Sequence, residues 1–61
     1  MNKYQFGQIV VANENSTIKA GTVGKIIDLW QDGAFWKYEI AWRETAHFIT
    51  VAREKDIDLA E

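Results

Sequence analysis

The dipeptide Asp32-Gly33 lies between two runs that are rich in aromatic and β-branched residues, one ending at residue 31 and the other starting at residue 34. Asp-Gly in such a setting strongly favours a tight β-hairpin, because a type I′ turn needs positive φ at both central positions. We therefore predict one long hairpin over residues 23–42, with its two-residue turn at Asp32-Gly33.

Pairing outward from this turn assigns every residue of the hairpin to a face, since directly opposed side chains share one. The predicted pairs are Trp30 with Phe35, Leu29 with Trp36, Asp28 with Lys37, Ile27 with Tyr38, Lys25 with Ile40 and Val23 with Trp42. The core face then holds Val23, Ile27, Leu29, Trp36, Tyr38, Ile40 and Trp42, and the outer face holds Ile26, Asp28, Trp30, Phe35, Lys37 and Glu39. Lys25 also falls on the core face. It either lies at the rim or is turned outward, with Ile26 turned inward, by a β-bulge beside Gly24; we favour the bulge.

The segment before the hairpin predicts one strand and one loop. Residues 8–12, QIVVA, are β-branched and short, which favours a strand whose inward face stays undecided. We expect Tyr4 and Phe6, which precede it, to cover one end of the core. Residues 13–21 are polar and turn-prone, so they predict a loop anchored by Ile18, and loops of this length are often functional.

The segment after the hairpin predicts two strands and a 3₁₀ turn. A connection at residues 43–46 returns the chain and sets Trp42 opposite His47, Ala41 opposite Phe48, Ile40 opposite Ile49 and Tyr38 opposite Val51. This register places Ile49 and Val51 in the core and Phe48 outside. Residues 53–56 are charged and suit a 3₁₀ turn, and residues 57–59 alternate as a last strand.

The composition limits both the stability and the chemistry of the chain. Sixty-one residues predict a single domain over 1–61, near the lower limit for independent folding. There is no cysteine and only one histidine, so we expect no disulfide, no metal and no cofactor. The start MNKYQF does not resemble a secretory signal, and the apolar runs are far shorter than the roughly 20 residues that span a bilayer. We therefore expect a cytoplasmic protein without a membrane role.

Three stretches carry a resemblance to a known fold: Gly7-Gln8-Ile9-Val10-Val11, Gly21-Thr22-Val23-Gly24-Lys25-Ile26 and Asp56-Ile57-Asp58-Leu59. Together with five short strands and a 3₁₀ turn before the last strand, they resemble bacterial SH3-like domains, including the KOW type and small accessory barrels. The resemblance implies an all-β, five-stranded SH3-like barrel. An OB-fold is the alternative, but the chain is short for it and offers no helix between strands. The sequence lacks the ALYDY-type segment and the Trp-Trp pair of peptide-binding SH3 domains, which argues against recognition of proline-rich peptides.

Catalytic chemistry finds little support in the sequence. His47 is the only histidine and Ser16 the only serine, and neither has an evident partner. The carboxylates are spread over turns and the outer face, where solvated roles account for them. We therefore expect no enzyme and no catalytic residue.

The outer aromatic residues are the candidate binding site. Trp30, Phe35 and Phe48, with Lys37 beside them, are expected on one exposed face, and clustered apolar groups in water usually mark an interaction surface. The first reading is a protein-interaction module that self-associates or docks on a partner. The alternative is a single-stranded nucleic-acid binder, in which the rings would stack on bases. The phosphates would then be met by Lys25, Lys37, Arg43 and Arg53. The net charge of −2 favours a protein partner or a homodimer.

Overall fold

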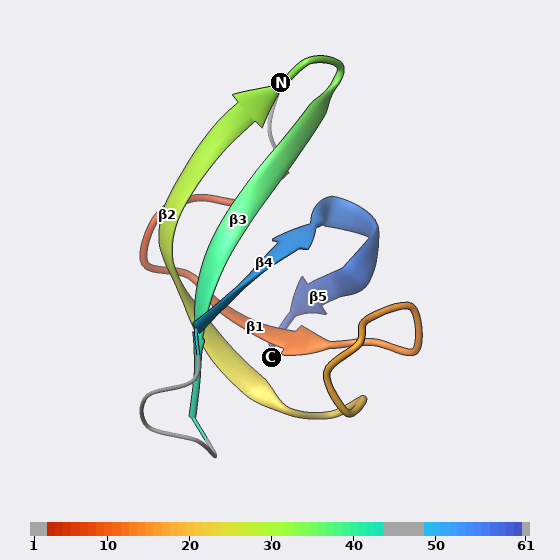
Figure 1. Cartoon of the computed structure of the whole chain (residues 1–61). Helices are drawn as coiled ribbons and strands as arrows, with labels where there is room; N and C mark the ends of the chain where they lie inside the picture. The colour runs from red at the N-terminus through yellow and green to blue at the C-terminus, as the bar shows by residue number, and fades with distance from the viewer. Residues whose placement is uncertain (1–2, 44–48, 61) are drawn as a thin grey trace.

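The computed structural model describes residues 3–43 and 49–60. These residues form one antiparallel sheet with the strand order β4-β3-β2-β1-β5 (Figure 1). The elements are β1 (Ile9–Ala12), β2 (Val23–Asp32), β3 (Phe35–Trp42), β4 (Ile49–Arg53), the 3₁₀ turn η1 (Glu54–Asp56) and β5 (Ile57–Leu59). The all-β class is confirmed, as are the predicted positions of the 3₁₀ turn and the last strand.

The described sheet is open. β4 and β5 lie at the two ends of the strand order, and no pairing joins them within the described residues, so closure into a barrel is not confirmed. In Figure 1, β2 curves across the molecule: its first residues pair with β1, and most of its length pairs with β3. In the described part of the chain we find no helix with the length and apolar character needed to cross a membrane.

The turn of the central hairpin lies one residue later than predicted, at Gly33 and Ala34, with Asp32 opposite Phe35. Gly33 has a φ of 64°, and no described residue other than glycine has positive φ. Positive φ at the first central position alone defines a type II′ turn, which needs glycine there as much as a type I′ turn needs it.

Between the turn and the bulge, the pairing is shifted by two residues from the predicted register, and on the other side of the bulge it is shifted by one. The structure therefore contradicts each pair predicted from the sequence: Trp30 with Phe35, Leu29 with Trp36, Asp28 with Lys37, Ile27 with Tyr38, Lys25 with Ile40 and Val23 with Trp42. Because side chains alternate with a period of two, a shift of two residues keeps each side chain on its face. Tyr38, Ile40 and Trp42 accordingly face the core as predicted, and Trp36 is half-buried against it.

A β-bulge interrupts the β2–β3 pairing between Ile26 and Asp28. It turns Lys25 outward and buries Ile26 completely, as expected from the bulge alternative, although it lies at Ile27 and not beside Gly24. An inserted residue reverses the alternation locally, which lets Ile26 and Leu29 both face inward despite their odd spacing. The assignment of Ile26 to the outer face is therefore wrong.

Gly24 lies directly opposite Trp42, and the indole ring of Trp42 covers the backbone there. A Cβ at this position would come within 2.6 Å of both Trp42 Cε3 and Ile40 Cγ2. The glycine is thus required by a close side-chain approach, with no unusual φ involved. It lets the largest core residue lie flat on the sheet.

β4 is one residue out of the predicted register, and its two faces are exchanged as a result. Thr50 lies opposite Ile40 and Ala52 opposite Tyr38, whereas Ile49 and Val51 are 51% and 53% exposed. The prediction that Ile49 and Val51 enter the core is wrong. The Thr50 hydroxyl accepts a 2.7 Å hydrogen bond from the Trp42 indole N–H, which explains a polar residue on the inner face.

The segment 44–48 lies outside the described residues. Ala41, which was predicted opposite Phe48, lies opposite Ile49. The predicted outward position of Phe48 and the predicted pairing of His47 with Trp42 fall on residues that the structure does not describe.

The core is continuous and is covered at one end by the N-terminal segment. It consists of Tyr4, Val10, Ala12, Ile26, Tyr38, Ile40, Trp42, Ala52 and Ile57. The inward face of β1, which the sequence left open, is that of Val10 and Ala12. Tyr4 covers the core as predicted and Ile18 packs against it, but Phe6 is 69% exposed, so its predicted covering role is wrong.

Candidate functional site

The outer face of the hairpin brings three of the four predicted binding residues together. Trp30 lies directly opposite Lys37, and Lys37 lies opposite Arg53 of β4, so one row crosses three strands. Phe35 follows on the same face, opposite Asp32. Trp30 is 37% exposed and Phe35 is 62% exposed. The fourth predicted residue, Phe48, is not among the described residues.

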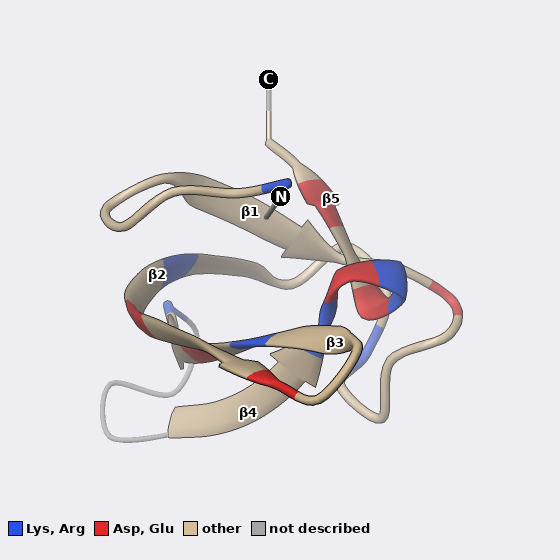
Figure 2. Cartoon of the chain, turned by 90° about the horizontal axis from the view of Figure 1, so that it is seen from above, with Lys and Arg blue, Asp and Glu red and all other residues tan. Residues whose placement is uncertain are grey.

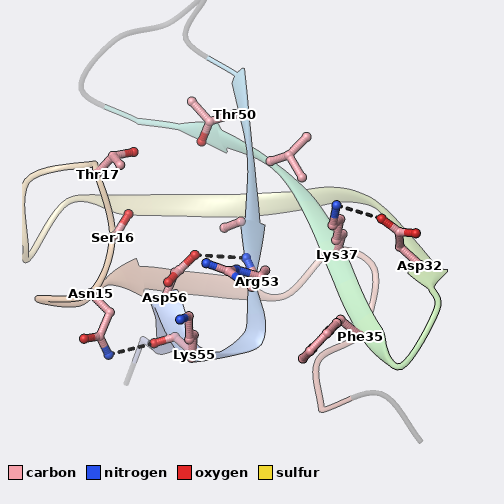
Figure 3. Close-up of a pocket in the computed structure, with 12 residues that line it drawn as sticks. Asn15, Ser16, Thr17, Asp32, Phe35, Lys37, Thr50, Arg53, Lys55 and Asp56 are labelled. Carbon is pink, nitrogen blue, oxygen red and sulfur yellow. Dashed lines mark hydrogen bonds and ion pairs between the residues drawn. The ribbon is translucent and has the colours of Figure 1, made fainter.

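An ion pair connects the two strands at this hairpin tip. Lys37 Nζ lies 2.7 Å from Asp32 Oδ2, along the diagonal that passes between Trp30 and Phe35 (Figure 3). The side chains of Lys37 and Asp32 are 34% and 59% exposed, so the pair contributes at most about 1 kcal/mol to stability. It directs the Lys37 ammonium toward the Asp32 carboxylate.

A groove with a cavity volume of about 450 Å³ lies between the hairpin tip and the loop that follows β1. Four segments surround it: the loop residues 15–17, the hairpin tip with Phe35 and Lys37, β4 from residue 50 onward, and the end of η1 (Figure 3). Phe35 also lines a second hollow of about 440 Å³ together with Trp36 and Glu54. The exposed ring thus stands at the mouth of two adjacent hollows.

The loop wall of the groove is held in place by side-chain amides. Asn13 Nδ2 and Asn15 Nδ2 both donate to the carbonyl oxygen of Lys55, at 2.9 and 3.2 Å. Asn13 Oδ1 also accepts the Asn15 backbone N–H, and Ser16 Oγ accepts that of Ile18. These local bonds explain why a polar, turn-prone loop keeps a defined shape. They also give Ser16 a structural role.

The charges of the groove are unevenly paired. Asp32 is engaged by Lys37, and Asp56 Oδ2 accepts the backbone N–H of Arg53 at 3.2 Å. By contrast, neither Arg53 nor Lys55 forms an ion pair with any described residue. Figure 2 shows the acidic and basic residues of η1 close together at this end of the molecule. The groove therefore presents two cations that form no ion pair within the described part of the chain.

A buried hydroxyl and a carboxylate connect the N-terminal segment to η1. Tyr38 donates its hydroxyl proton to Glu54 Oε2 at 2.7 Å, and that oxygen also accepts the Lys3 backbone N–H at 2.7 Å. Burial, and then the bond to Glu54, raise the pKa of Tyr38 to about 12, while the bonds from Tyr38 and Lys3 lower the pKa of Glu54. Neither pKa moves toward 7, so this pair is better suited to fastening the chain than to proton transfer.

Sequence reasoning missed the groove and Lys55, although it named Arg53 as a candidate contact to phosphate. Arg53 and Lys55 were placed in a charged turn, and residues 15–17 in a loop whose length alone suggested function. Residues about 40 positions apart meet here, and no local pattern encodes that contact. Among the described residues, His, Cys, Asp and Glu side chains do not gather into a group that could hold a metal ion.

No protein-family model matches the chain, and neither a curated protein nor a solved structure is similar to it. The hairpin tip and the adjoining groove are thus the features from which a function can be inferred.

Proposed function

We propose that this chain is a small, non-catalytic protein-interaction module that docks a partner protein on the hairpin tip and the groove beside it. The observation that carries the proposal is the position of Phe35, 62% exposed at the mouth of the groove, with Trp30 and Lys37 on the same face. Exposed aromatic residues next to a concave site are typical of binding surfaces, whereas they add nothing to the solubility of a free monomer.

Burial of the two rings would contribute substantially to an association. At about 25 cal/mol per Å² of apolar surface, covering Trp30 and Phe35 contributes roughly 2 to 5 kcal/mol. The contribution of the Asp32–Lys37 ion pair is small by comparison. We therefore place the main contribution to affinity on the rings and treat the charges as a source of selectivity.

We assign this module to the SH3-like barrels of the bacterial type. We also propose that the protein is located in the cytoplasm. The strand order, the long loop after β1 and the 3₁₀ turn before β5 support the assignment. The sequence has no cysteine, which fits a reducing compartment.

The proposal is tested by replacing Trp30 and Phe35 together with serine. Both side chains lie outside the core, so the variant should keep its circular dichroism spectrum and most of its stability. It should lose association, measured by light scattering for self-association and by pull-down for other partners. The matched control replaces Phe6 and Leu59, two exposed apolar residues that line neither the groove nor the second hollow.

Two results would count against this function. If the Trp30 and Phe35 variant unfolds, the rings are structural. If it associates as strongly as the control variant, the hairpin tip is not the binding surface.

Single-stranded nucleic acid is the second candidate, and the row formed by Trp30, Lys37 and Arg53 favours it, since cations beside an aromatic ring suit a base and its phosphate. The net charge of −2 and the neutralisation of Lys37 by Asp32 favour protein instead. A salt titration with a single-stranded oligonucleotide separates the two. Binding to nucleic acid weakens steeply as salt rises, whereas an apolar protein interface is little affected.

A further inference from the structure

One edge of β4 pairs with no described strand, and we call it the free edge. The backbone register shows which groups point toward it. Arg53 donates its N–H to Asp56, so this group points away from β3. In an antiparallel strand, residues two apart direct their N–H and C=O groups to the same side, which assigns Ile49 and Val51 to the free edge as well. Thr50 and Ala52 then bond to β3.

The hydrogen bonds on the opposite side of β3 lead independently to the same orientation for the backbone groups of Ile49 and Val51. Arg43 donates its N–H to the Val23 carbonyl in β2, so by the same alternation Ala41 also directs its backbone groups toward β2. Ala41 is the partner of Ile49 in β4 and therefore has no backbone group left for it. No described residue bonds to the outward backbone groups of Ile49 and Val51.

The free edge adjoins the groove, because Val51 and its neighbours in β4 line it. An unpaired edge strand is a template for a further strand, and extended peptides bind such edges through main-chain hydrogen bonds. A volume of about 450 Å³ lies within the range of ligand pockets. The opposite wall, residues 15–17, is held on η1 and so provides a defined limit to the groove.

We propose that the free edge of β4 pairs with an extended, acidic segment of a partner protein, which joins the sheet as an additional strand within the groove. The proposal rests on the interaction function above and specifies its mode and the chemistry of the partner. The charges select an acidic segment, because three cations, Lys37, Arg53 and Lys55, line the groove against two carboxylates, Asp32 and Asp56. Of these cations, Arg53 and Lys55 form no ion pair with any described residue.

A second copy of the chain fits this edge less well. Its β4, ITVAR, has no acidic residue and would bring a second arginine to the groove. Its β5 carries Asp58, but the Ile57 carbonyl on that strand already accepts the Tyr4 hydroxyl. An acidic strand from another protein meets neither obstacle.

The experiment uses the full-length ¹⁵N-labelled chain and two blocked peptides, one of alternating Glu and Val and one of alternating Lys and Val. With the Glu peptide in the millimolar range, the amide protons of Ile49 and Val51 should shift downfield and gain protection from exchange. Those of Thr50 and Ala52, already bonded to β3, should change little. The Lys peptide should bind about tenfold more weakly, as expected for the loss of a few exposed ionic contacts.

A pair of variants isolates the edge itself. Val51→Pro removes the outward N–H at a position where proline is tolerated in edge strands, so the chain should stay folded and lose the Glu peptide. Val51→Thr keeps the N–H and should bind as the wild type does. If Val51→Pro unfolds, the shifts of the Ile49 and Val51 amide protons in the wild-type spectrum decide whether the peptide pairs with the edge of β4.

Three results would overturn the proposal. Shifts confined to Trp30 and Phe35 would refute edge pairing and leave the proposed interaction function standing. Equal affinity for the two peptides would refute the acidic partner. No shift with either peptide in the millimolar range would refute the edge as a receptor for extended segments.

Discussion

At the β5 edge the Ile57 carbonyl accepts a 2.9 Å hydrogen bond from the Tyr4 hydroxyl, whereas at the β4 edge the outward groups of Ile49 and Val51 meet no described residue. Tyr4 is buried and packs edge-to-face on Tyr38, with ring centroids 5.5 Å apart. The N-terminal segment thus satisfies an outward carbonyl at one edge, whereas the other edge borders a groove.

This difference suggests a division of roles between the two edges of a very small sheet, one for stability and one, on our proposal, for binding. Unpaired edges invite association with any extended chain, and proteins usually cover or charge them. Here the covering residue also fills the core, so a single side chain serves both purposes. Of the groups on the outward edge of β4, the Arg53 N–H alone is satisfied by a described residue, through Asp56. On our proposal, the positive charges of Arg53 and Lys55 restrict which strands can pair there.

The largest expected effect comes from opening the covered edge. Tyr4→Ala removes a buried ring and should lower the free energy of unfolding by about 3 to 5 kcal/mol, as aromatic truncations in cores do. Tyr4→Phe, which removes only the bond to Ile57, should cost about 1 kcal/mol. Chemical denaturation measures both, with Phe6→Ala as the control that should stay within about 0.5 kcal/mol. Equal losses for Tyr4→Ala and Phe6→Ala would show that the N-terminal segment does not cover the edge.

The centre of the sheet, on which both edges depend, is tested by Gly24→Ala. The added Cβ would lie 2.6 Å from Trp42 Cε3, so the indole must move. Overpacking of this kind typically costs about 1 to 3 kcal/mol. Thermal or urea unfolding should show this loss, while Lys25→Ala, at the next and exposed position, should change little. A Gly24→Ala variant as stable as the wild type would mean that Trp42 does not lie on the backbone of β2.

The register of β4 is tested by two substitutions of nearly equal size. Thr50→Val removes the acceptor of the Trp42 indole N–H and should cost about 1 to 2 kcal/mol, although it adds an apolar group to an inner position. Val51→Thr on the exposed face should stay within about 0.5 kcal/mol. The reverse order of stabilities in denaturation experiments would favour the register in which Val51 faces the core.

The hydrogen bonds that join the N-terminal segment to Glu54 and Tyr38 should make the free energy of unfolding depend on pH. The pKa of Glu54 is lowered in the folded state, so its contribution is present above its ordinary value of 4.5 and is lost as pH falls through the lowered value. The pKa of Tyr38 is raised from 10.0 to about 12, so its contribution is present below pH 10.0 and is lost as pH rises toward 12. Urea unfolding as a function of pH should show both losses, and Glu54→Gln should flatten the acidic one. An unchanged acidic slope in Glu54→Gln would contradict this account.

The sequence predicted most of the strands but not their pairing. Trp36, Tyr38, Ile40 and Trp42 alternate strictly, and the faces of β3 follow from that pattern alone. In β4 the same rule failed: Ile49 and Val51 are the larger apolar residues, but the inner face needed an acceptor for Trp42 and a small residue opposite Tyr38. Tertiary requirements overrode the local hydrophobic pattern there.

The candidate site was predictable only where it is local. Trp30, Phe35 and Lys37 share a face because they belong to one hairpin, and an error of two residues in the register does not change faces. The groove was not predictable, since it brings residues 15–17 to η1 through bonds such as that of Asn15 to Lys55. Contacts of this separation depend on the complete fold.

Amide hydrogen exchange in the free protein tests the central claim, that the β4 edge is open, most directly. Thr50 and Ala52 should exchange slowly because their N–H groups bond to β3, while Ile49 and Val51 should exchange at rates close to those of an unstructured chain, whatever the protein concentration. Protection of Val51 equal to that of Ala52 would contradict the account, because the edge would then be paired already. Protection of Val51 that grows with protein concentration would contradict it as well, since the edge would then pair with a second copy of the chain.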